Sequence, residues 1–219
     1  MNKVVVFDLD DTLYKEIDFL RSAYHELSIV LESKYALSNV YSLLWESYSQ
    51  GLNAFNELNK SYGIDISLND FLSIYRLHIP KIALSIDTRK VLEALVQKEV
   101  CLGVLTDGRA ITQSQKMKSL GLDEYIPMEN WIISENIGFE KPSLKGYLYF
   151  QEKYFSDSSY YYYVGDNTDK DFKAPNKLKW ESFCLLDNGS NIHKQNFSQS
   201  KEMLPTHILN NIVDLLKYI

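Results

Sequence analysis

The alternation of strand-like and helix-like segments after residue 87 is the feature that most restricts how this chain of 219 residues can fold. Four short apolar runs have the length and composition of buried strands: 100–105, 131–133, 160–164 and 182–186. Amphipathic or helical segments follow these runs: 110–120, 143–155, 169–178 and 207–218. Parallel strands need such crossover connections, so the sequence predicts an α/β fold with a parallel sheet that helices cover on both faces.

A further buried strand is predicted at 3–7, and a long helical block separates it from the others. From about residue 15 to residue 86 apolar side chains recur every three or four positions, as helices require. Asp87 or Thr88 is expected to cap the helix that leads back to the sheet. The sequence therefore predicts an α/β core with an all-helical insertion after its first strand.

Composition limits the partners that the chain can have. Lys and Arg number 23 and Asp and Glu 29, a net charge of −6, which argues against an extended basic surface for nucleic acid. No apolar run approaches the roughly 18 to 20 residues that cross a bilayer, so we expect a cytoplasmic protein without a membrane partner. Cys101 and Cys184 lie in apolar runs and are expected to be buried thiols. The tyrosines at 160–163 are expected to pack, with their hydroxyl groups at the sheet margin.

Two acidic segments follow predicted strands. Asp8 and Asp10 come after the first strand and lie on the same side of an extended segment, where like charges repel unless a cation or a proton relieves them. Asp166 and Asp171 follow the strand at 160–164. Solvated acids at a strand end, or a turn before a capped helix, are the alternative interpretations. Carboxylate oxygens from Asp8 and Asp166 suit Mg²⁺.

Two further segments have groups that bind anions. Thr106-Asp107-Gly108 follows a strand and opens a helix, where a hydroxyl group and backbone amides can hold a phosphate. Lys141 precedes another helix and could neutralise that phosphate. Each segment alone is also compatible with ordinary helix entry or a solvated lysine. Because the carboxyl ends of parallel strands bind the ligands of α/β sheets, the four segments together predict phosphoryl transfer.

These four segments resemble, in order, the motifs of the haloacid dehalogenase-like (HAD) hydrolase superfamily. The matching stretches are Phe7 to Leu13, Leu105 to Gly108, Glu140 to Pro142, and Val164 to Asn167 with Asp171. The resemblance implies a Rossmann-like core of residues 1–14 and 88–219, with a helical cap of residues 15–87 that closes over the site. The motifs fall within 1–14 and 88–190, and nothing is carried over to the last thirty or so residues.

The resemblance implies a role for each acidic residue. Asp8 would be the nucleophile that forms an aspartyl-phosphate, and Asp10 the acid that protonates the leaving oxygen and then activates water. Asp8, the backbone carbonyl of Asp10 and Asp166 would hold Mg²⁺, with Asp171 in the outer shell or orienting a bound water.

The remaining motif residues would hold the phosphoryl group. The resemblance assigns this role to Thr106, the amides of Asp107 and Gly108, and Lys141. Many relatives have asparagine where this chain has Asp107, and we expect its side chain to turn away and cap the following helix. Residues 172–175 and Trp180 also depart from the family pattern, at packing positions.

The predicted function is hydrolysis of a small phosphorylated metabolite, with Mg²⁺ as cofactor. Carbon–halogen hydrolysis is disfavoured, because it has no oxygen leaving group for Asp10 to protonate. A phosphomutase and a non-catalytic phosphate-binding protein remain alternatives. Some polar residues of the insertion are possible contacts for the leaving group, but none is assigned: Arg21, Tyr24, His25, Tyr48, Arg76, His78 and Lys81. The sequence predicts no oligomeric state.

Overall fold

The computed structural model describes residues 2–219, and the chain forms two compact units. One unit consists of the chain up to Glu16 together with Ala83–Ile219, and the other of Ile17–Ile82. Within residues 2–219, no helix combines the length and the apolar character that crossing a membrane requires.

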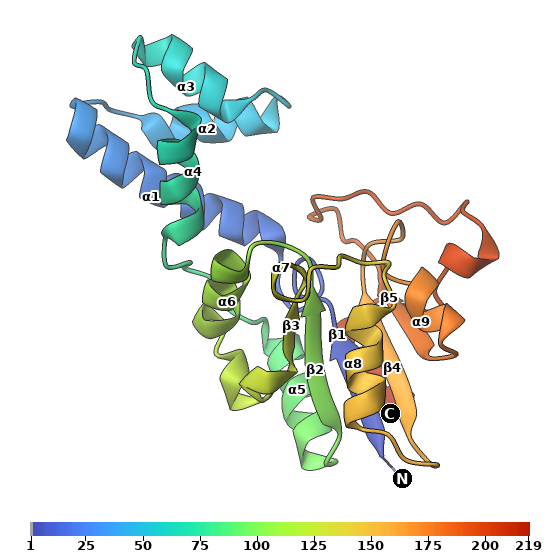
Figure 1. Ribbon diagram of the computed structural model, residues 1–219. Helices are drawn as coiled ribbons and strands as arrows, with labels where there is room; N and C mark the ends of the chain where they lie inside the picture. The colour runs from blue at the N-terminus through green and yellow to red at the C-terminus, as the bar shows by residue number, and fades with distance from the viewer. Residues whose placement is uncertain (1) are drawn as a thin grey trace. The chain divides into compact units, whose positions relative to one another are not determined.

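The first unit has an α/β architecture (Figure 1). Its strands are β1 (Lys3–Phe7), β2 (Cys101–Thr106), β3 (Trp131–Ile133), β4 (Tyr160–Gly165), β5 (Glu181–Leu185) and β6 (His207–Leu209). Its α-helices are α5 (Ile86–Gln97), α6 (Ala110–Ser119), α7 (Ser134–Ile137), α8 (Lys145–Lys153) and α9 (Lys173–Lys177). Four short 3₁₀-helices complete it: η1 (Leu122–Glu124), η2 (Met128–Asn130), η3 (Lys201–Met203) and η4 (Ile212–Lys217).

The described strands form one six-stranded sheet in the order β3-β2-β1-β4-β5-β6, and every neighbouring pair is parallel. This confirms the predicted parallel α/β core. Strand β1 lies between β2 and β4, so Phe7 is in register with Val104 on one side and Val164 on the other. The residues that follow these three strands are therefore brought to one edge of the sheet.

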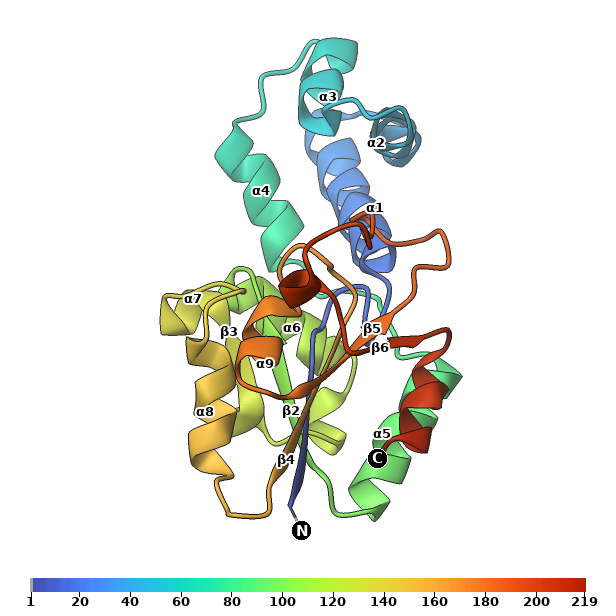
Figure 2. The ribbon, with the colours of Figure 1, turned by 90° about the vertical axis from the view of Figure 1, so that its right-hand side faces the viewer.

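Helices cover both faces of the sheet, with α5 on one side and α8 on the other (Figure 2). Val4 and Val6 of β1 pack in a cluster with Tyr147 and Phe150 of α8, all buried. A Cβ atom at Gly103 in β2 would lie 2.2 Å from the Phe150 ring, so glycine is required for this approach. Burial on both faces explains why the strands are continuous apolar runs.

The second unit is entirely helical. It contains α1 (Glu16–Tyr35, which begins in the first unit), α2 (Val40–Ser49), α3 (Ala54–Tyr62) and α4 (Leu68–Leu77). Its interior is a cluster around Leu27, Leu31, Leu44 and Leu58, each at most 1% exposed. Local signals delimit the helices: the side chains of Asn53 and Ser67 cap α3 and α4, and Gly63 ends α3 at φ 62°.

Three predicted helices differ from the observed ones. The predicted helix at 207–218 is wrong, because His207–Leu209 pairs with β5 as a strand and only a 3₁₀-helix follows. The helix predicted at 169–178 is confined to α9, since Asp171 accepts from backbone amides in the preceding turn. Ser85, and not Asp87 or Thr88, caps α5, with its hydroxyl oxygen accepting from the amide of Thr88.

The predictions for two side-chain types have mixed outcomes. Both cysteines are free thiols, with Cys184 buried and Cys101 half-buried. Tyr163 of β4 packs as expected, but its hydroxyl group does not lie at the sheet margin. It is completely buried and hydrogen-bonded to Lys141 and Asp171, because the carboxyl end of β4 is a place where charged groups converge.

Candidate active site

The predicted motif residues converge at the carboxyl edge of the sheet, around a cavity of about 140 Å³. Its lining includes three of the four predicted acids and the hydroxyl-bearing motif: Asp8, Asp10, Asp11, Glu16, Thr106, Asp107, Asp166, Asn167, Lys170 and His193. Strands β1, β2 and β4 each end beside this cavity because they are neighbours in the sheet. Gly108 lines a second cavity.

Lys141 is the centre of the acidic cluster. Its Nζ lies 2.8 Å from Asp8 Oδ1, 2.8 Å from Asp171 Oδ1 and 3.0 Å from the Tyr163 hydroxyl oxygen. The lysine side chain is 1% exposed. Burial alone would lower the pKa of Lys141, but attraction to Asp171 and Asp8 outweighs burial and holds that pKa well above its usual value. The lysine is therefore a fixed positive charge.

Asp171 is fully occupied by donors from the protein. Its Oδ2 accepts from the backbone amides of Asp166 and Asn167, at 3.1 and 2.9 Å. Its Oδ1 accepts from Lys141 and from the Tyr163 hydroxyl group. Asp171 therefore organises the loop after β4, which agrees with an indirect role near a metal better than with direct ligation.

The acidic cluster fits a divalent cation. Oxygen atoms of Asp8, Asp166 and Asp171 all lie within 4.8 Å of one another. Burial, followed by repulsion from Asp8 and Asp171, raises the pKa of Asp166 to about 9, and burial raises that of Asp8 to about 7. Carboxylates held together in this way gain most from a hard cation that relieves their repulsion. Asp8 and Asp166 are the residues that fit as direct ligands.

Asp10 has a different environment from the other acids. Its Oδ1 accepts from Lys116 Nζ at 2.7 Å and from the Tyr14 hydroxyl group, and its Oδ2 accepts from Gln113 Nε2 at 2.8 Å. Burial would raise the pKa of Asp10, but Lys116 and these hydrogen bonds outweigh it and lower that pKa. The protein thus favours the charged form of Asp10.

The prediction for Asp107 is wrong. Its side chain does not cap α6, which begins after Arg109 without a side-chain cap. Instead, Asp107 Oδ1 accepts from the Lys141 amide at 3.0 Å, and Oδ2 pairs with Lys170 Nζ at 2.8 Å. Two nearby donors satisfy the carboxylate better than a helix end does, and the Ala110 amide donates to Glu135 instead.

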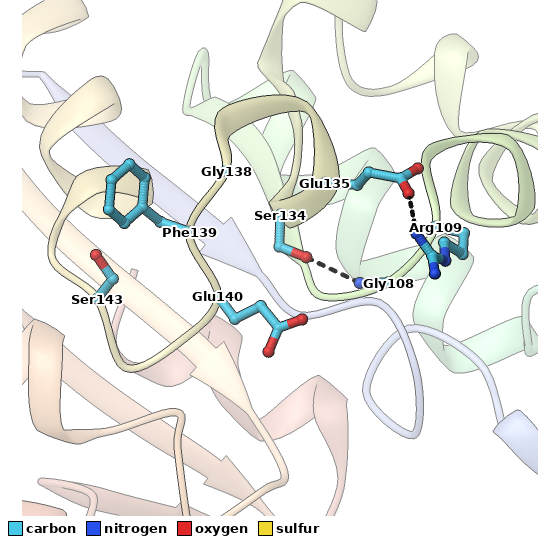
Figure 3. A pocket seen from close by; sticks show the side chains of 8 residues that line it. All are labelled: Gly108, Arg109, Ser134, Glu135, Gly138, Phe139, Glu140 and Ser143. Atoms are coloured by element: carbon cyan, nitrogen blue, oxygen red, sulfur yellow. Dashed lines mark hydrogen bonds and ion pairs between the residues drawn. The ribbon is translucent and has the colours of Figure 1, made fainter.

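A larger cavity of about 670 Å³ lies along the segment that follows β3 (Figure 3). Ser134 points toward Gly108, and its Oγ accepts from the Gly108 amide at 3.0 Å. Arg109 and Glu135 form an ion pair at 2.6 Å across the same region. The Gly108 amide, which was predicted to bind phosphate, thus donates to a side chain in this structure.

Sequence reasoning missed several residues around the acidic edge. Gln113 and Lys116 are polar residues of α6 that are only 2% and 3% exposed, and their spacing of one helical turn is a signal that could have been noticed. Asn191 was not predicted either, because its loop contains no motif. Its Nδ2 donates to Asp166 Oδ2 at 2.9 Å, and its Oδ1 accepts from Lys15 Nζ at 2.6 Å.

The fold and the motif order define a class of protein. A sequence profile of the haloacid dehalogenase-like hydrolases matches residues 5–184, and the chain belongs to this family. A glyceraldehyde 3-phosphate phosphatase of Methanocaldococcus jannaschii is 28% identical over 189 residues, which cover 81% of this chain and 82% of that protein. The phosphatase of the same name from Methanothermobacter thermautotrophicus is 33% identical over 156 residues, or 66% and 68% of the two chains.

Solved structures show the same fold. The magnesium-bound HAD hydrolase YfnB of Bacillus subtilis superposes with a TM-score of 0.71 at 21% identity, covering 99% of this chain and 98% of that one. A HAD phosphatase of Thermococcus onnurineus superposes with a TM-score of 0.61 at 22% identity, covering 99% and 97%. At this identity the likeness concerns the fold alone.

Proposed function

We propose that this HAD-family hydrolase is a Mg²⁺-dependent phosphatase that acts on small phosphate monoesters through an aspartyl-phosphate. The observation that carries the proposal is the contact of Asp8 with Lys141, a buried fixed cation, beside the clustered Asp166. A nucleophilic carboxylate next to a positive charge is what transfer of an anionic phosphoryl group needs. The names of the archaeal relatives support the same class of reaction.

The first chemical step uses Asp8 and Asp10. An oxygen of Asp8 bonds to phosphorus, the bond from phosphorus to the alcohol oxygen breaks, and its electron pair stays on that oxygen. The oxygen takes a proton from the carboxyl group of Asp10 and leaves as the alcohol. Lys141, Thr106 and the Asp107 amide hold the phosphoryl oxygens, and in this role they stabilise the charge of the transition state.

The second step restores the enzyme. Asp10, now a carboxylate, accepts a proton from water as the water oxygen bonds to phosphorus, and the Asp8–phosphorus bond breaks to release inorganic phosphate. The lowered pKa of Asp10 favours the charged form that this step needs, whereas the first step needs the protonated form, which the negative charge of a bound phosphate favours. Mg²⁺ held by Asp8 and Asp166 would neutralise part of the negative charge of the phosphate. We assign the helical unit the role of a cap that selects the leaving group.

The substrate is proposed to be a short phosphorylated metabolite. Three-carbon phosphates are the first to test, since the two archaeal relatives are named for glyceraldehyde 3-phosphate. A phosphomutase would use the same residues but would retain the phosphoryl group, so it would convert a phosphorylated sugar without releasing phosphate.

The test measures phosphate release from a panel of phosphate monoesters, with Mg²⁺ or with a chelator. Asp8→Asn is the matched variant, because an amide of nearly the same size is not a nucleophile. We expect metal-dependent release from the wild type and a loss of about 10⁵-fold in kcat for the variant, whose thermal unfolding should remain cooperative. Near-wild-type release by Asp8→Asn would remove Asp8 as the nucleophile. Isomerisation without release would favour the mutase.

A further inference from the structure

Gln113 connects two parts of the active site that the proposed reaction uses separately. Its Nε2 donates to Asp10 Oδ2 at 2.8 Å and to Thr106 Oγ1 at 2.6 Å. Asp10 follows β1, whereas Thr106 ends β2, so the two acceptors belong to different strands. One neutral amide therefore fixes the distance between the proton-transferring carboxyl group and the hydroxyl group that would hold phosphate.

The surroundings of Gln113 leave its amide little freedom. The residue is 2% exposed, and its side chain packs against the backbone at Gly108, where a Cβ atom would lie 3.3 Å from the Gln113 side chain. Burying a side-chain amide destabilises the folded protein unless the amide donors find acceptors. Here both acceptors are groups of the active site.

The carboxylate of Asp10 is held from both sides. Lys116 and the Tyr14 hydroxyl group donate to Oδ1, and Gln113 donates to Oδ2. Donors to both oxygens define the plane of the carboxyl group as well as its position. The contact on Oδ2 also extends to the phosphate side of the site, because the same Gln113 Nε2 donates to Thr106.

We propose that Gln113 is a positioning residue, which aims the carboxyl group of Asp10 at the oxygen of the leaving alcohol by tying it to Thr106. This inference rests on the proposed phosphatase function. A misplacement of about 1 Å in such a group can cost about 10²-fold in rate. The effect should depend on the leaving group, because an alkoxide needs a proton to depart and a stabilised aryloxide or carboxylate does not.

The test compares kcat/KM for two leaving groups in Gln113→Met, which keeps the side-chain length, removes both hydrogen bonds and leaves Lys116 in place. The alkyl substrate is the best phosphate monoester of the panel. The second substrate is p-nitrophenyl phosphate or acetyl phosphate, whichever the wild type hydrolyses faster. Since kcat/KM includes only steps up to departure of the leaving group, it is independent of the later attack by water. Gln97→Met, at an exposed position of α5, is the control.

We expect kcat/KM for the alkyl substrate to fall about 10-fold or more beyond any fall for the activated one, and Gln97→Met to match the wild type. Equal falls for both substrates would overturn the inference and leave Gln113 with a structural role. If Gln113→Met does not fold, Gln113→Asn applies the same comparison, because its shorter amide cannot reach both acceptors. If the wild type hydrolyses no phosphate compound, the proposed function itself is overturned. Equal falls for both substrates, measured against an active wild type, overturn only the role of Gln113.

Discussion

The acidic edge of the α/β unit and the interior of the helical unit bury opposite kinds of side chain. At the edge, Asp8, Asp166 and Lys141 are each at most 7% exposed, and their charges face one another. The interior of the helical unit is made of leucines such as Leu27 and Leu58, and its buried serines, Ser28 and Ser47, each bond back to a carbonyl of their own helix. Burying charges costs stability and burying leucines supplies it, so the difference separates residues placed for chemistry from residues placed for folding.

The largest effect on stability is expected when Lys141, the buried cation among the acids, is replaced. Lys141→Met would leave Asp8 and Asp171 buried without their partner, and we expect a loss of about 3–5 kcal/mol in the free energy of unfolding, with loss of phosphatase activity. The pKa of Asp8 is already raised to about 7 by burial. A carboxyl group whose pKa is higher in the folded than in the unfolded protein stabilises the folded state at low pH, and this contribution is lost as the pH rises through the folded-state pKa. The loss in the free energy of unfolding of Lys141→Met should therefore be larger at pH 8 than at pH 5.

Chemical denaturation at the two pH values measures this loss. Lys177→Met, an exposed lysine of α9, is the control and should be within about 0.5 kcal/mol of the wild type. A loss for Lys141→Met that is the same at both pH values would show that the acids do not depend on the lysine for their charge balance.

The same contrast explains what could be predicted from the sequence. Strand-ending motifs such as Asp8, Thr106 and Asp166 were predictable because a parallel sheet places all strand ends at one edge, whatever the details of packing. Gln113 was not predicted, because which buried face of a helix meets the site depends on the three-dimensional docking of α6. Asn191 belongs to a loop, where neither periodicity nor turn chemistry specifies a partner. The final helix was predicted wrongly because tertiary pairing with β5 outweighed the apolar spacing of 207–218.

A truncation in the helical interior should affect stability and not chemistry. Leu58 is completely buried, and Leu58→Ala should cost about 3 kcal/mol through lost burial and the cavity left behind. Because 17–82 is a compact unit of its own, we expect hydrogen exchange to accelerate within it while the amides of β1 and β4 keep their protection. Leu52→Ala, at a side chain that is 48% exposed, is the control. Equal loss of protection in β1 would mean that the two units unfold together.

The smallest expected effect tests whether the loop after β5 belongs to the acidic edge. Asn191→Ala removes the donor to Asp166 Oδ2, so this carboxylate would be less well oriented toward a bound cation. We expect the Mg²⁺ concentration for half-maximal activity to rise about 10-fold, with kcat at saturating Mg²⁺ within about two-fold of the wild type. Calorimetric titration with Mg²⁺ should show the same weakening without substrate. A lower kcat with an unchanged Mg²⁺ requirement would instead place Asn191 on the substrate side of the site, and a wild-type profile would leave the loop outside the chemistry.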